Sequence, residues 1–117
     1  MDIRRIAPGT RMSGAVVAGG LVFTSGQVDA QGAGVTAQTQ AILAKIDALL
    51  AQAGTDKSRL VWASIWLADI AAFDEMNAVW DAWIDPAAPP ARATVESTLA
   101  KPAYRVEIAV VAAAGAG

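Results

Sequence analysis

The sequence predicts a single α+β domain in which a mixed β-sheet carries two helices on one face. Runs of β-branched and aromatic residues indicate strands, and two other segments place apolar residues at helical spacing. The chain of 117 residues is long enough for one hydrophobic core and too short for two independent ones. Because short connections join the strands to the helices, both helices belong on the same face of one sheet. We therefore expect residues 1–117 to form one domain.

The N-terminal half is expected to contain two strands followed by a helix. The strands fall at about residues 14–18 and 21–25, and Gly19-Gly20 between them suits a tight hairpin because glycine tolerates positive φ. The segment from residue 36 to 54 then predicts a helix that ends at Gly54. Its single apolar stripe consists of Ile42, Leu43, Ile46, Leu49, Leu50 and Ala53.

The C-terminal half is expected to contain a strand, a helix and two more strands. The apolar run LVWASIWL at residues 60–67 is typical of a central strand that is covered on both faces. A helix follows, with Asp69 favouring its first turn and its end placed before Pro86. Its apolar residues at helical spacing are Phe73, Met76, Val79, Trp80 and Trp83. The runs ARATVES at 91–97 and AYRVEIAVVAA at 103–113 complete the order strand, strand, helix, strand, helix, strand, strand.

The amino-acid composition favours a self-associating protein without affinity for nucleic acid. Hydrophobic residues make up 55% of the chain and charged residues only 17%. Soluble domains typically contain about 25% charged residues, so we expect some apolar surface to be buried in a closed homo-oligomer. The net charge of −2 gives no basic footprint for binding phosphates.

The absence of cysteine and histidine restricts the chemistry further. It excludes disulfides, metal sites built from Cys or His, and nucleophiles activated by imidazole, so we expect no metal and no cofactor. The opening MDIRRIAPGT lacks the apolar core of a signal peptide, and no apolar run reaches the roughly 18 residues that a membrane span needs. We therefore expect a cytoplasmic protein that does not bind membranes.

The segment PPARATVES at residues 89–97 contains the strongest candidate for a ligand-binding residue. Two prolines stop the preceding structure, a β-branched run follows, and Arg92 stands between small neighbours. A guanidinium offers a planar fork that matches a carboxylate and stays protonated near neutral pH. The alternative interpretation is a structural arginine in a salt bridge.

Several motifs together resemble one known family. LVFTSGQVDA, the segment from AILAKIDALL to MNAVWDAW, PPARATVES and YRVEIAVVAA are similar to the RidA/YjgF family of reactive intermediate deaminases, also called L-PSP endoribonucleases. The resemblance runs from about Ile6 to Ala113, and RMSGAVV, MNAVWDAW and PAYRVEIAVVAA are closest to its YoaB-like branch. It implies a chorismate-mutase-like homotrimer in which three sheets form a central barrel and three ligand clefts lie between subunits.

The resemblance also implies a set of ligand-binding residues. In the family, the arginine at the position of Arg92 grips the carboxylate of a small 2-imino or 2-keto acid. Ser25 and Gly26 of the TSGQ segment, Thr94 and Trp83 match other positions that line the cleft. Three of these residues have a structural alternative: Ser25 and Gly26 could form a bulged strand end, and Trp83 could be a core residue.

The last strand departs from the family pattern at the catalytic base. We align the glutamate that activates water in the deaminases with Ala109, and Glu107 lies about 7 Å away on the same face of the strand. The first hypothesis is therefore a binder of a small carboxylate metabolite with weak or absent deaminase activity. The alternative is an active 2-iminobutanoate or 2-iminopropanoate deaminase, a hydrolase whose base has moved, for example to Glu107. An endoribonuclease is the least favoured, because the chain has no histidine and no basic patch.

Overall fold

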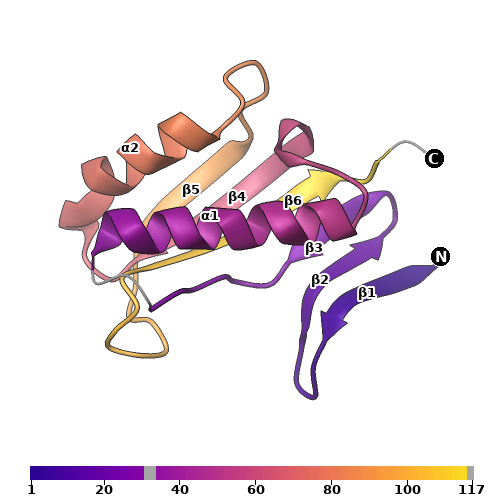
Figure 1. Cartoon of the computed structure of the whole chain (residues 1–117), viewed down its shortest axis with the longest axis horizontal. Coiled ribbons are helices and arrows are strands. Elements are labelled where there is room, and N and C mark those ends of the chain that lie inside the picture. The colour runs from indigo at the N-terminus through magenta and orange to yellow at the C-terminus, as the bar shows by residue number, and fades with distance from the viewer. Residues whose placement is uncertain (31–33, 116–117) are drawn as a thin grey trace.

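A computed structural model describes residues 1–30 and 34–115. They form a six-stranded mixed sheet in the order β1-β2-β3-β6-β4-β5, with two α-helices on one face (Figure 1). Only the pair β4 and β5 is parallel, and the other neighbours are antiparallel. The strands are β1 (Ile3–Pro8), β2 (Ser13–Ala18), β3 (Leu21–Thr24), β4 (Leu60–Leu67), β5 (Ala91–Glu96) and β6 (Val106–Ala113). The helices are α1 (Val35–Gln52) and α2 (Phe73–Trp83), with short 3-10 turns η1 (Lys57–Arg59) and η2 (Ile70–Ala72).

The hydrophobic core lies between the helices and one face of the sheet. The predicted apolar stripe of α1 is buried, with Ile42, Ile46 and Leu50 fully inaccessible to solvent. Strand β6 alternates strictly between buried and half-buried residues, as expected for a strand with one covered face. Its buried residues, Val106, Ile108, Val110 and Ala112, therefore point toward the helices.

Two glycine predictions are confirmed by the backbone. Gly19 and Gly20 have φ angles of 59° and 78°, and they join Ala18 to Leu21 in a two-residue hairpin. Positive φ at both turn residues gives the twist that matches the flanking strands. Gly54 has a φ of 79° just after α1, where a residue with a side chain would be strained.

The N-terminal strand β1 was not predicted. Its residues IRRIAP show no alternation of apolar and polar side chains. The strand lies at the edge of the sheet, and Ile6 is its one buried residue. Pairing with β2 decides its conformation. Asp69 was expected at the start of the second helix, but its side chain accepts from the N–H of Ala71 and caps the turn η2 instead.

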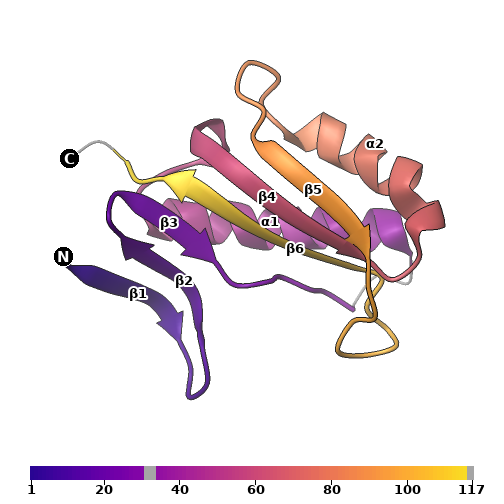
Figure 2. The same ribbon diagram turned by 180° about the vertical axis from the view of Figure 1, so that it is seen from behind.

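No helix covers the opposite face of the sheet (Figure 2), and several apolar side chains on that face are exposed. Strand β4 is internal, between β6 and β5, but it is covered by helices on one face rather than on both. On the open face, Trp62 pairs with Val111, and Val111 also pairs with Phe23. Phe23 remains 42% exposed and Trp62 39%. Such a surface is typical of a contact with another subunit.

Candidate functional site

Arg92 lies on the helix side of the sheet, at the edge strand β5. In the parallel register with β4 it stands beside Ala63, which is fully buried under the helices. Its guanidinium carbon is 5.3 Å from the ring centroid of Trp80 and 5.9 Å from that of Phe73, both in α2. Two aromatic rings thus fix the cation by cation–π attraction.

The guanidinium of Arg92 has no protein partner for its donors. Among the described residues, no carboxylate oxygen lies within ion-pair distance of it and no hydrogen bond occupies its N–H groups. Burial lowers the pKa of Arg92, and the negative charge of Asp81 partly opposes that shift. A half-buried cation without an anion is suited to binding a carboxylate, and the described residues offer it no salt bridge within one chain.

Two buried polar atoms next to Arg92 also lack partners. Thr94 follows Arg92 on the same face of β5, and its Oγ1 atom is buried without a hydrogen bond. Asn77 lies between Phe73 and Trp80 on the same side of α2, and its Oδ1 atom is likewise unsatisfied. Buried polar groups in native proteins normally have a hydrogen-bond partner, so these two atoms are available to bond a ligand. We call Phe73, Asn77, Trp80, Arg92 and Thr94 the arginine half of the site.

A second group of polar residues lies where β3 ends. The Ser25 N–H and hydroxyl both donate to the carbonyl oxygen of Gly14, at 2.9 and 3.2 Å. The backbone of Gln27 forms a two-way bridge with Ile108 of β6, and its side-chain amide donates to Ser25 Oγ at 3.0 Å. These bonds tie the TSGQ segment to β2 and β6. They leave the N–H of Gly26 without an acceptor among the described residues.

The carboxylate of Glu107 lies directly against Gly26. A Cβ built on Gly26 would overlap Glu107 Oε2, so only a residue without a side chain leaves room for the acid in this position. Glu107 pairs with Trp66 of β4 and belongs to the open face of the sheet. We call Ser25, Gly26, Gln27 and Glu107 the carboxylate half of the site.

The two halves lie on opposite faces of the sheet within one chain. Arg92 neighbours the buried Ala63, whereas Glu107 neighbours Trp66 on the open face. Successive side chains of a strand point to opposite faces, so no movement of these side chains alone brings the halves together. A ligand that touches both halves therefore requires two copies of the chain.

Trp83 was expected to line the ligand cleft, and Ala109 was aligned with the family's catalytic glutamate. Neither residue is the one that lies next to Arg92 or Gly26 in the structure. The Trp83 indole N–H donates to Asp47 of α1 at 3.0 Å, and the tryptophan beside Arg92 is Trp80. Ala109 pairs with Ser64 on the open face, but it is Glu107 whose carboxylate reaches Gly26. Phe73, Asn77 and Trp80 were not predicted as site residues. Their spacing of four and three in α2, opposite the PPAR motif, was the available signal.

The described part of the chain contains neither a metal-binding cluster nor a membrane-spanning helix. Within residues 1–30 and 34–115, no three acidic side chains gather in a way that could hold a metal ion. No helix of these ranges is long and apolar enough to cross a membrane.

Comparisons with known proteins identify the family. The model of the family Endoribonuclease L-PSP matches residues 2–114. A RutC family protein of Haemophilus influenzae is 41% identical over 96% of this chain and 98% of its own length. The RutC family protein YoaB of Escherichia coli is 40% identical over 97% and 99% of the two chains. The crystal structure of a YjgF family member from Neisseria meningitidis superimposes with a TM-score of 0.98, at 45% identity and with 100% and 98% of the chains covered. The chain therefore belongs to the Endoribonuclease L-PSP family, the RidA/YjgF proteins, with RutC and YoaB among its relatives.

Proposed function

We propose that the protein binds a small 2-keto or 2-imino acid at a cleft between two subunits of a homotrimer. The observation that carries this proposal is the unpaired guanidinium of Arg92, held between Phe73 and Trp80. The ligand carboxylate accepts from the two N–H edges of that guanidinium and from the hydroxyl of Thr94, whose Oγ1 has no partner among the described residues. The open apolar face supports the oligomer, because burying its exposed aromatic side chains, such as Trp62 and Phe23, against another subunit removes apolar surface from water.

Calorimetry with 2-ketobutyrate tests this proposal. Arg92→Ala should weaken binding roughly tenfold to over a hundredfold, the effect of one lost charge-assisted contact of about 1.5 to 3 kcal/mol. Arg92→Lys should restore little of it, because an ammonium cannot reproduce the two-pronged contact. Arg59→Ala is the control: Arg59 is exposed and donates to the carbonyl of Ala114, away from the arginine half. Equal binding by wild type and Arg92→Ala would make Arg92 a structural residue.

The contact between Glu107 and Gly26 favours a second function at the same cleft, hydrolysis of the bound imine. Glu107 takes a proton from a water molecule while the water oxygen bonds to C2 of the 2-imino acid. The C=N π electrons pass to the nitrogen, which receives that proton from Glu107 to give a carbinolamine at C2. The carboxylate then moves the proton of the C2 hydroxyl to the amine, the C–N bond breaks, and ammonia leaves while the 2-keto acid remains. The Gly26 N–H, which lacks an acceptor among the described residues, can donate to the developing negative charge or to the attacking water.

Mixing two inactive variants tests whether the cleft uses two subunits. In a cyclic trimer, Arg92→Ala chains still supply Glu107, and Glu107→Gln chains still supply Arg92. Unfolding and refolding the two variants together should therefore restore activity at about one quarter of the clefts, the random-mixing fraction for a site shared by two chains. Each variant refolded alone should stay inactive. If the refolded mixture is no more active than either variant alone, Arg92 and Glu107 do not act together from two different chains.

A further inference from the structure

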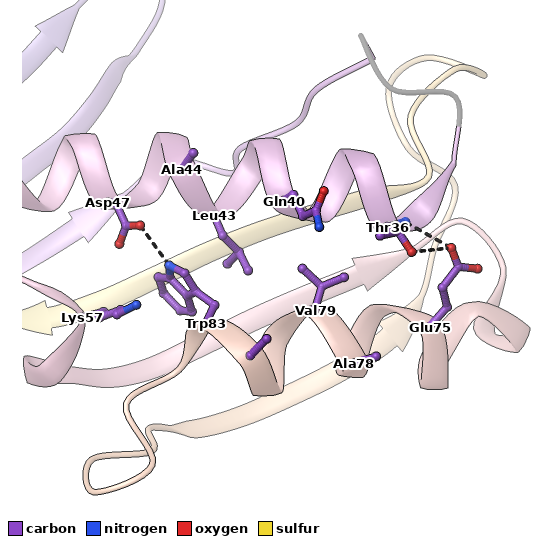
Figure 3. Close-up of a pocket in the computed structure, with 11 residues that line it drawn as sticks. Thr36, Gln40, Leu43, Ala44, Asp47, Lys57, Glu75, Ala78, Val79 and Trp83 are labelled. Atoms are coloured by element: carbon purple, nitrogen blue, oxygen red, sulfur yellow. Dashed lines mark hydrogen bonds between the residues drawn. The ribbon is translucent and has the colours of Figure 1, made fainter.

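A second cavity, separate from the cleft proposed above, lies between α1 and α2 (Figure 3). Its volume is about 560 Å³, which is within the range of cavities that bind small molecules. Leu43 of α1 and Val79 of α2 form an apolar floor, and the small side chains of Ala44, Ala78 and Ala82 leave the space above it open.

Hydrogen bonds brace both ends of this cavity. At one end the Trp83 indole N–H donates to Asp47 Oδ2. At the other end, the N–H and hydroxyl of Thr36 donate to Glu75 Oε2 at 3.1 and 2.9 Å. Both acidic side chains on the wall thus already accept hydrogen bonds from the opposite helix. The helices are held apart at a fixed width, and the cavity is preformed.

Lys57 supplies the unpaired charge of the cavity. Its ammonium lies 5.1 Å from the centroid of the Trp83 ring, at the end of the cavity away from Glu75 (Figure 3). Among the described residues, Lys57 has no carboxylate partner and its ammonium donates no hydrogen bond. An ammonium carries a positive charge and three donors, so a carboxylate is a suitable partner for it.

We propose that this cavity is a binding site for a small aromatic monocarboxylate. The flat apolar body lies on Leu43 and Val79 beside the Trp83 ring, and the carboxylate meets Lys57. A ring system fits because an apolar floor formed by Leu43 and Val79 and the face of an indole offer flat surfaces for it to stack on. Arg92 does not line this cavity: its guanidinium contacts Phe73 and Trp80, and only the Trp80 ring, 5.3 Å from that of Trp83, touches the cavity wall.

The probe is 2-naphthoate, with binding measured by calorimetry and by the shift of the Trp83 indole N–H signal in nitrogen-15 NMR spectra. Lys57→Met should weaken binding about five- to tenfold, while Lys57→Arg keeps it. Asp47→Asn should strengthen binding, since an amide oxygen still accepts from Trp83 but no longer repels the anion. Ala82→Leu fills the cavity from an exposed position and should abolish binding. The NMR spectrum also shows whether each variant is folded, and Ala78→Leu is the second filling variant.

Two controls separate this site from the rest of the molecule. Lys101 also lies over an aromatic ring, that of Tyr104 at 5.8 Å, but away from the cavity, so Lys101→Met should leave naphthoate binding unchanged. Arg92→Ala should leave it unchanged as well. Binding that survives Ala82→Leu, is insensitive to Lys57→Met, or disappears with Arg92→Ala would overturn the proposal, as would a wild type that binds no naphthoate at millimolar concentration.

Discussion

The two halves of the candidate site differ in how much of each is completed by the chain itself. The arginine half is enclosed by α2 and β5, with its cation already fixed by two rings and two polar atoms already desolvated. The carboxylate half lies on an open sheet face, where Glu107 rests on Gly26 beside exposed apolar side chains. The difference teaches that recognition of a carboxylate can be built within one chain. In the trimer proposed above, by contrast, the environment of the acid would depend on the subunit that covers the open face.

The largest expected effect concerns the chemistry of the carboxylate half. Glu107→Gln should lower imine hydrolysis by about 10²- to 10⁴-fold, because a positioned acid/base group contributes that much. Binding of 2-ketobutyrate should change little, since Arg92 is intact. Ammonia release from a 2-iminopropanoate generated in the assay gives the rate.

Gly26→Ala provides a matched test of the same position. The new methyl group occupies the place of the Glu107 carboxylate, which is the end of a flexible side chain and can move away. The variant should therefore fold and should lose activity as Glu107→Gln does. Full hydrolysis by both variants would show that another group activates the water, and the relocated-base hypothesis would be wrong.

The next effect concerns the proposed contact between subunits on the open face of the sheet. Trp62→Glu should dissociate the trimer, because it places a charge in a surface that the assembly removes from water. Light scattering coupled to gel filtration measures the mass. Ile70→Glu is the control, since Ile70 is 45% exposed in η2 and does not belong to the sheet. A wild type that is monomeric at micromolar concentration would contradict the assembly itself.

A smaller effect is expected from loosening the arginine half. Phe73→Ala removes one of the two rings beside the guanidinium but not the charge. Because cation–π contacts at partly exposed sites contribute about 0.5 to 1 kcal/mol, binding of 2-ketobutyrate should weaken about two- to fivefold. Phe73→Leu, which keeps the apolar cover without the ring, separates loss of the cation–π contact from loss of packing. Equal affinity in all three proteins would assign the orientation of Arg92 to Trp80 alone.

The smallest effect is an expected insensitivity to pH. Burial lowers the pKa of Arg92, but a guanidinium is so basic that it begins to lose its proton only at strongly alkaline pH. The pKa of Arg92 is lower in the folded state than in the unfolded state. The contribution of this group to the free energy of unfolding therefore changes only at strongly alkaline pH. Affinity for 2-ketobutyrate should accordingly be constant between about pH 6 and 9 in calorimetric titrations. A drop in affinity within this window would indicate that another titrating group binds the carboxylate.

The sequence by itself determined most of the secondary structure and pointed to Arg92 as a candidate ligand-binding residue. Apolar periodicity placed the buried stripe of α1, and the Gly19-Gly20 pair placed the hairpin, because these signals depend on local spacing and backbone freedom alone. The local sequence also singled out Arg92, but its expected role in binding a carboxylate came from the resemblance to the RidA/YjgF family, because the residues alone left a structural salt bridge open.

Only the tertiary structure decided what depends on contacts between distant segments. Edge pairing, and not an alternating pattern, made β1 a strand. The packing of α2 against β5 selected Trp80 rather than Trp83 as the neighbour of Arg92, although both have helical spacing from Phe73. The bridge between Gln27 and Ile108 brought Glu107 to Gly26, over 80 residues apart in sequence. Sequence patterns record which face of an element is apolar, and only the folded chain fixes which polar groups on different elements meet.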